Sequence, residues 1–236
     1  MKDILNFLAQ LRENNNKQWF DIHRDEYKVI KARIETLTEQ LISKISQWDS
    51  SIKGLQTKDC LYRINCDIRF SKNKLPYKSH IGIFISKGGK KAGYGGYYLH
   101  IEPCEDSEKG FHFLASGTYM LESKYMKVIR EDLYADYDYF NKILKKAKSY
   151  NLEAGSALKK VPRGFESGTQ CDELLKLKNY CLIRNLEQKE LLNPEILSNK
   201  GEDIIANGAL STFIANEFRP TCDFLNFINQ IGRAHV

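Results

Sequence analysis

The hydrophobic pattern of this chain changes period in its middle third, and this change constrains the fold more than any other feature. Between residues 81 and 116, apolar side chains alternate with small or polar ones in three runs: residues 81–86, 97–102 and 111–116. A two-residue repeat is typical of a strand with one buried face. The turn-like connections are too short for a parallel crossover, which needs about a dozen residues or more. The sequence therefore predicts consecutive antiparallel strands.

Before and after these strands in the sequence, apolar residues recur at the three- to four-residue spacing of helices. Toward the N-terminus we expect a helix over residues 3–13 with Asp3 as its N-cap, and a long helix from Lys17 to Trp48. The other expected elements are a strand over residues 60–64, helices over 125–144 with a break near Asp136, a short helix at 174–177, a strand over 180–186, a helix opening at Asn193-Pro194, and a helix over 221–229. We therefore expect an α+β fold in a single domain over residues 1–230, mainly an antiparallel sheet flanked by long N-terminal and C-terminal helices.

Cysteine usage and hydropathy indicate the compartment. The six cysteines form no C-x-x-C pair and no zinc-finger spacing, and a chain of 236 residues with 42% hydrophobic residues needs no disulfides to hold a core. We find no signal peptide and no apolar run of membrane-spanning length. The sequence predicts a reduced, cytoplasmic protein that does not enter a membrane. Its net charge of +6 is mildly basic and favours an acidic partner.

The last six residues, IGRAHV (residues 231–236), break the pattern of the preceding helix. They resemble a reading frame of a common sequencing adapter. We expect them to be a non-native tail that replaces the natural C-terminus.

The segment from Cys60 to His80, CLYRINCDIRFSKNKLPYKSH, holds the densest group of cations in the chain. Pro76 fixes a turn within it. One hypothesis is an anion site, because arginine forks and lysine ammonium groups bind phosphate or carboxylate; its residues are Arg63, Arg69, Ser71, Lys74 and Lys78. The other hypothesis is that Arg63 and Arg69 pair with Asp67 and nearby glutamates while the lysines are solvated.

A second basic loop surrounds Pro162 and contains Lys159, Lys160 and Arg163. It strengthens the anion hypothesis only if the two loops meet in space. Taken alone, it is typical of a solvated surface loop.

A third group combines histidines with a carboxylate on the strands. We expect His100, Glu102 and His112 on the face of the sheet away from the core, with His80 at the start of its strand. Such a group permits acid–base chemistry or metal binding, but the sequence does not fix the strand register. Because no local ligand spacing is present, we expect no metal here, and the sequence assigns no cofactor.

Blocks along nearly the whole chain resemble a widespread family of conserved hypothetical proteins, a domain of unknown function with the core R-x-x-R-D-x-R-F-S-x-x-K-x-P-Y-K. The matching blocks are NNNKQWFDIHRDEY (14–27), RINCDIRFSKNKLPYKSH (63–80), GYYLHIEP (96–103), GTYM (117–120), LKKVPRGF (158–165) and ELLKLK (173–178). The resemblance implies a single α+β domain. It brings no established substrate, reaction or cofactor.

This chain departs from the family pattern at three places. Cys66 stands where the family usually has a second arginine, just before Asp67. Leu121 stands where the family often has a proline after the GTYM-like block. Residues 168–170, Gly-Thr-Gln, replace an Asp-His-Pro block. If that histidine is functional in relatives, this copy is weakened or differently tuned.

Our leading hypothesis is a domain, enzymatic or not, that binds a phosphorylated or other anionic ligand through loops 63–78 and 159–163. The residues expected to bind it are Arg63, Arg69, Ser71, Lys74, Lys78 and Arg163, and the candidate catalytic residues are Asp67 and His100. A nucleic-acid-binding protein is the alternative, because Tyr62, Phe70 and Tyr77 are interleaved with the cations and could stack on bases. A structural or interaction domain with purely internal ion pairs is the third class.

Overall fold

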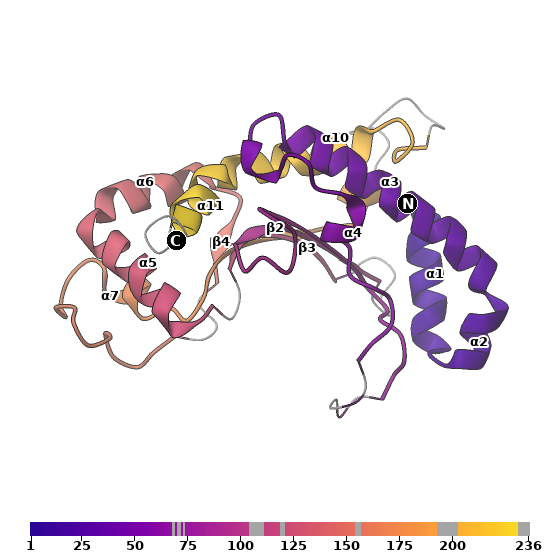
Figure 1. The fold of residues 1–236 in the computed structure, drawn as a ribbon, viewed down its shortest axis with the longest axis horizontal. Helices are drawn as coiled ribbons and strands as arrows, with labels where there is room; N and C mark the ends of the chain where they lie inside the picture. The colour runs from indigo at the N-terminus through magenta and orange to yellow at the C-terminus, as the bar shows by residue number, and fades with distance from the viewer. Residues whose placement is uncertain are drawn as a thin grey trace.

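The computed structural model describes residues 1–67, 69, 72, 74–103, 111–118, 121–153, 157–192 and 203–230. Its centre is a five-stranded antiparallel sheet in the order β1-β2-β3-β5-β4 (Figure 1). The strands are β1 (Ile81–Ser86), β2 (Gly96–Glu102), β3 (Phe111–Thr118), β4 (Asn151–Leu152) and β5 (Tyr180–Leu186). The expected α+β class, the antiparallel pairing and the last strand are confirmed.

Helices surround the sheet on one face and at both ends. The N-terminal helices are α1 (Lys2–Glu13), α2 (Lys17–Ile22), α3 (Arg24–Ile45), the 3-10 turn η1 (Ser50–Ile52) and α4 (Thr57–Cys60). The later ones are α5 (Ser123–Ala135), α6 (Tyr137–Lys146), α7 (Asp172–Leu175), α8 (Gln188–Leu192), α10 (Ala209–Phe218), η2 (Arg219–Thr221) and α11 (Cys222–Asn229). No helix among these described segments is long and apolar enough to cross a bilayer.

The core lies between one face of the sheet and helices α3, α10 and α11 (Figure 1). Alternate residues of the central strands face these helices, as the two-residue repeat predicts. Tyr97 is the largest of them: its ring contacts Trp48 and Phe218, and its hydroxyl donates a 3.0 Å hydrogen bond to the carboxylate of Asp49. One buried polar contact therefore ties β2 to the segment that follows α3.

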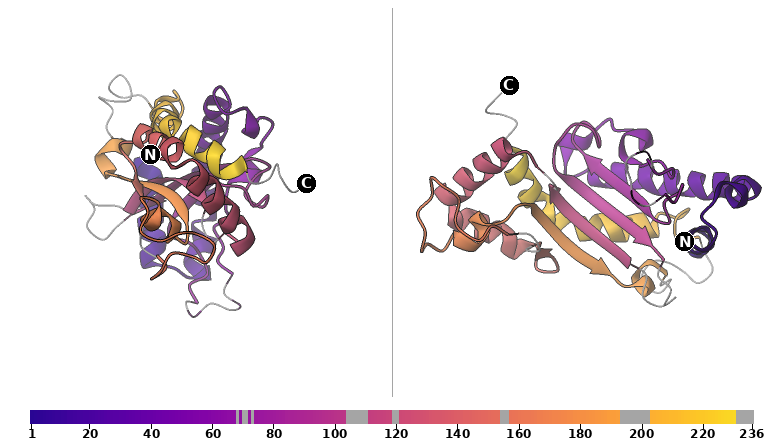
Figure 2. Two further views of the ribbon diagram at one scale, coloured as in Figure 1. Left: turned by 90° about the vertical axis from the view of Figure 1, so that its left-hand side faces the viewer. Right: turned by 90° about the horizontal axis from the view of Figure 1, so that it is seen from below.

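The opposite face of the sheet is left open by the helices of the described chain (Figure 2, right). Helices α1 and α2 lie beyond one end of the sheet, and α5, α6 and α7 lie beyond the other, so the molecule has the shape of an arch (Figure 1). The uncovered face forms the underside of this arch. We refer to it as the open face.

Several expected boundaries are corrected. Helix α1 has Met1, not Asp3, at its N-cap, because the N-terminal ammonium pairs with Asp3 inside the first turn. The expected long helix is two helices, since the chain turns at His23, whose ring stacks on Trp19 and hydrogen bonds with its carbonyl oxygen. Residues 57–60 are helical, so the expected strand over residues 60–64 reduces to one bridge from Leu61 to Ile83.

Other expectations are confirmed or lie outside the described residues. Asp136 separates α5 from α6 and caps α6 through the backbone N–H of Tyr139. Asn193-Pro194 and the tail 231–236 lie outside the described residues. The five described cysteines carry free thiols, and three of them, Cys60, Cys171 and Cys181, are buried.

Candidate functional site on the open face of the sheet

The strand register decides which side chains share the open face. Gly82 pairs with His100, His100 pairs with Phe113, and Glu102 pairs with Phe111. Directly opposed residues of antiparallel strands point to the same face, and residues two apart along a strand do as well. The core residues Leu99 and Ile101 flank His100 along β2 and point to the other side.

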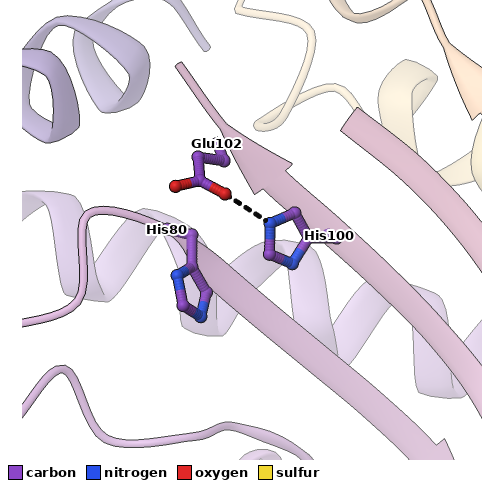
Figure 3. Close-up of side chains that lie close together, drawn as sticks. All are labelled: His80, His100 and Glu102. Atoms are coloured by element: carbon purple, nitrogen blue, oxygen red, sulfur yellow. Dashed lines mark hydrogen bonds and ion pairs between the residues drawn. The ribbon is translucent and has the colours of Figure 1, made fainter. Parts of the chain in front are cut away.

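Two histidines and one carboxylate meet at the end of this face. The side chains of His80, His100 and Glu102 point toward one another (Figure 3), and one donor atom from each lies within 4.8 Å of the others. His100 Nε2 is 3.1 Å from Glu102 Oε2, and the rings of His80 and His100 stack with centroids 4.7 Å apart. We call these three residues the His–Glu cluster.

The imidazole of His100 is held on all sides. Its Nδ1 is 2.9 Å from the hydroxyl of Tyr98, and Phe113 stacks on its ring at 4.7 Å and 13°. Because Nε2–H donates to the carboxylate of Glu102, Nδ1 accepts from the tyrosine hydroxyl. Gly82 leaves the space that the Tyr98 ring occupies, since a Cβ there would lie 2.8 Å from the tyrosine oxygen. The result is a continuous Tyr98–His100–Glu102 hydrogen-bond chain.

His112 lies on the core side of the sheet and not on the open face, where the sequence placed it. It pairs with Ile101 and is buried on the core side, so it does not share a face with His100 and Glu102. The expectation was wrong because it took Phe111 and Phe113 as the core side of β3, whereas these residues face the open side. From the core side, His112 holds the backbone of Glu102, because its Nδ1 accepts a 3.2 Å hydrogen bond from the backbone N–H of Glu102.

Burial sets the protonation of the cluster and its neighbours. The pKa of His80 is lowered, chiefly by burial and further by the neighbouring charges of His100 and Lys78, against the opposing effect of Glu102. Burial raises the pKa of Tyr98 to about 12. His80 is therefore neutral near pH 7 and Tyr98 keeps its proton. The arrangement can relay a proton or bind a cation.

The basic segment forms a two-armed extension of the sheet edge next to this cluster. Asn65 bridges Tyr77, and the backbone N–H of Cys66 donates to the carbonyl oxygen of Pro76. The amide of Asn15 fixes the extension, accepting from the backbone N–H of Tyr77 at 3.1 Å and donating to its carbonyl oxygen at 2.8 Å. In Figure 1 the two arms, residues 61–67 and 74–79, run downward from the sheet on the side of α1 and α2.

Arg63 and Lys78 lie on opposite arms of this extension. The ammonium of Lys78 donates a 2.6 Å hydrogen bond to the backbone carbonyl of Arg63 and lies 5.9 Å from the ring centre of Tyr62. Burial, together with the charge of Arg63, lowers the pKa of Lys78. Within the described part of the chain, neither cation forms an ion pair. The backbone N–H of Tyr62 donates a 3.5 Å hydrogen bond to the carbonyl oxygen of Gly82, the residue beside the Tyr98 ring, so this arm lies next to the open face.

The other site residues expected in this segment are Asp67, Arg69, Ser71 and Lys74, which come at the ends of the two arms or between them in the sequence. Arg69 forms a salt bridge with Asp67 through two hydrogen bonds of 2.9 and 2.7 Å, and its side chain is 75% exposed. Lys74 is exposed. Ser71 lies outside the described residues. Asp67 is thus engaged as the partner of Arg69, away from His100, the other candidate catalytic residue.

The second basic loop is not near the first. Residues 157–171 lie by α5 and α7 at one end of the arch, whereas residues 61–67 and 74–79 of the extension lie toward the other end (Figures 1 and 2). Phe165 packs on Tyr134 of α5, and Lys159, Lys160 and Arg163 are exposed. The structure therefore places Lys78 beside Arg63 and Tyr62, two residues before His80 of the cluster, and leaves Arg163 apart.

The comparisons with known proteins identify the family. A family model described as a conserved hypothetical protein (DUF2461) matches residues 3–213. The chain belongs to DUF2461. No curated protein and no solved structure matches it. Membership of DUF2461 confirms the resemblance seen in the sequence and brings no substrate or reaction with it.

Two residues of this site, Tyr98 and Gly82, were missed by sequence reasoning, whereas Tyr62 was expected among the aromatic residues interleaved with the cations. Tyr98 and Tyr62 complete the surface between the cluster and Lys78, and Gly82 makes room for the Tyr98 ring. Tyr98 carried a readable signal, because it lies two residues before His100 in a strand and must share its face. Gly82 carried none, since its place depends on the pairing of separate segments.

Proposed function

We propose that this chain binds a small anionic ligand, of the phosphate or carboxylate class, on the open face beside Arg63 and Lys78. One observation carries the proposal: two cations are held side by side on opposite arms of the sheet extension, and neither is ion-paired to a carboxylate of the described residues. Lys78 is partly buried beside the charge of exposed Arg63, which disfavours its ammonium, and a bound anion relieves this cost.

The neighbouring surface favours a ligand that also has a flat apolar part. Tyr62 is 48% exposed and Phe111 is 59% exposed, and both lie at the edge of the open face. Aromatic rings beside polar groups supply stacking faces in ligand sites. Tyr98 and His100 lie between them on the same face, and the Tyr98 hydroxyl and both ring nitrogens of His100 are already hydrogen bonded.

The same geometry bears on the two other hypotheses, internal ion pairing and nucleic-acid binding. Internal pairing applies to Arg69, which is held by Asp67, but leaves Arg63 and Lys78 unexplained. Nucleic-acid binding would use the exposed cations along the whole projecting segment. It differs from a small-ligand site in its salt dependence, because each phosphate contact on a strand releases a counterion.

The test is calorimetric titration of the full chain with inorganic phosphate, with pyrophosphate and with a single-stranded oligonucleotide, each at low and at high salt. We expect pyrophosphate or phosphate to bind at one site per chain. Lys78→Met and Arg63→Gln should each weaken the affinity about tenfold or more, the loss expected for a charge-assisted hydrogen bond.

A matched control is Lys87→Met. Lys87 is exposed and also lies over a tyrosine ring, Tyr94, at 4.9 Å, but beyond the far end of β1. It should leave binding unchanged. Absence of binding by either phosphate, or equal affinity in the Lys78→Met and Lys87→Met variants, would refute the proposal. Steeply salt-dependent binding of the oligonucleotide alone would refute it in favour of nucleic acid.

A further inference from the structure

The His–Glu cluster is a group of potential metal ligands that the proposed anion site does not use. We propose that His80, His100 and Glu102 form a binding site for a divalent transition-metal ion such as Zn²⁺. Two imidazole nitrogens and a carboxylate oxygen are the donor set of many open metal sites in enzymes. The inference goes beyond the proposed anion binding and does not rest on it.

The distances fit such an ion. Metal–ligand bonds of about 2.0–2.2 Å place neighbouring ligand atoms about 3.0–3.5 Å apart. His100 Nε2 and Glu102 Oε2 already lie 3.1 Å apart, and the farthest donor atom of the three is within 4.8 Å of the others. His100 and Glu102 lie on β2 and His80 immediately precedes β1, so the three lie together at one end of these strands (Figure 3), and binding one ion requires the stacked His80 ring to turn.

The surroundings of His100 supply what a metal-bound histidine needs. When Nε2 binds a metal, the ring proton moves to Nδ1 and requires an acceptor. The Tyr98 hydroxyl is in place 2.9 Å from Nδ1, and its oxygen accepts that proton as readily as its O–H donates without the metal. Phe113 stacks on the imidazole and His112 holds the backbone of Glu102, so the ligands are oriented before the ion arrives.

The same arrangement leaves coordination positions free on the open face. The described chain supplies three donors from one side, and a tetrahedral or octahedral ion needs further ligands from solution or from a bound molecule. Structural metal sites are closed by four protein ligands, so this is the pattern of a site that handles a ligand at the metal.

The experiment uses the untagged full chain, stripped with EDTA and dialysed, and titrated with Zn²⁺ by calorimetry. Co²⁺ titration followed by visible absorption gives an independent readout of coordination. We expect one ion per chain, weakened about 100-fold or more by His80→Ala or His100→Ala, and about 10- to 100-fold by Tyr98→Phe, which removes only the outer hydrogen bond.

His23→Gln is the matched control, because His23 lies on the turn between α2 and α3, outside the cluster. It should bind Zn²⁺ as the wild type does. Glu102→Gln keeps the shape of a partly exposed side chain, so it tests the site even if a histidine variant fails to fold. Absence of saturable Zn²⁺ binding, or wild-type affinity in Glu102→Gln and Tyr98→Phe, would overturn the inference. Phosphate titration of the metal-free chain separates this outcome from failure of the anion site.

Discussion

Replacing Gly82 with alanine tests the open face without removing any of its functional groups. Gly82 lies opposite His100 in the register, and the Tyr98 ring lies over it. A Cβ at Gly82 would meet the tyrosine oxygen at 2.8 Å and the ring carbon Cε2 at 3.0 Å. Both contacts are with the far end of a movable side chain, so the ring moves and the backbone stays.

The expected change in stability is small because two effects oppose each other. Removing a glycine from a strand stabilises the fold by about 0.5–1 kcal/mol. Displacing Tyr98 breaks its hydrogen bond to His100, which costs about 0.5–1.5 kcal/mol. We expect the free energy of unfolding to change by less than about 1 kcal/mol, while Zn²⁺ affinity falls about tenfold or more because the outer partner of His100 is lost.

Urea unfolding measures the free energy of unfolding of Gly82→Ala, and Zn²⁺ titration measures its affinity for the ion. Gly82→Ala combined with Tyr98→Phe should bind no more weakly than either single variant, since both act on one hydrogen bond. A loss of more than about 2 kcal/mol in stability would mean that the backbone, not the ring, moved. Wild-type affinity in Gly82→Ala would refute the role given to the Tyr98 hydroxyl.

Three further predictions concern the scaffold. Gly117→Ala should cost about 3 kcal/mol or more in urea unfolding, because the backbone has φ +148° and the new Cβ would lie 2.2 Å from a carbonyl oxygen of β5; a cost below about 1 kcal/mol would contradict this close approach. Arg33 lowers the pKa of Asp203 to about 2, so the pair stabilises the fold above about pH 4 and loses this effect as the pH falls toward 2; allowing for solvent screening, wild type should lose about 1 kcal/mol more than Asp203→Asn, and parallel pH curves would argue against it. Asn15→Ala removes both hydrogen bonds to Tyr77 and should cost about 1–3 kcal/mol and weaken phosphate binding; unchanged phosphate affinity would show that the arms need no support.

The periodic elements were predictable because periodicity depends on local sequence. The alternation in β1, β2 and β3 indicated antiparallel strands, and Asp136 marked the break between α5 and α6. The break at His23 was not predicted, because the apolar stripe of α3 continues backward through α2 with helical spacing. A ring that hydrogen bonds to the preceding carbonyl oxygen is a contact that no spacing shows.

The candidate site was predictable in composition but not in arrangement. His80, His100 and Glu102 were singled out from alternation alone, and the register brought them together. His112 was placed on the wrong face because the phase of β3 depends on which of Phe113 and Leu114 packs inward, and both are apolar. The separation of the two basic loops followed from the path of the chain over the whole sheet, which local sequence does not encode.

The most direct test of the open face as a ligand site is nuclear magnetic resonance of the histidine side chains. Long-range ¹H–¹⁵N spectra of the ring nitrogens can follow His23, His80 and His100 while inorganic phosphate is added. The account predicts that the signals of His80 and His100, which lie beside Lys78 and the cluster, shift in a saturable manner while those of His23 stay fixed. Unchanged signals of His80 and His100 at saturating phosphate, or shifts confined to His23, would contradict it.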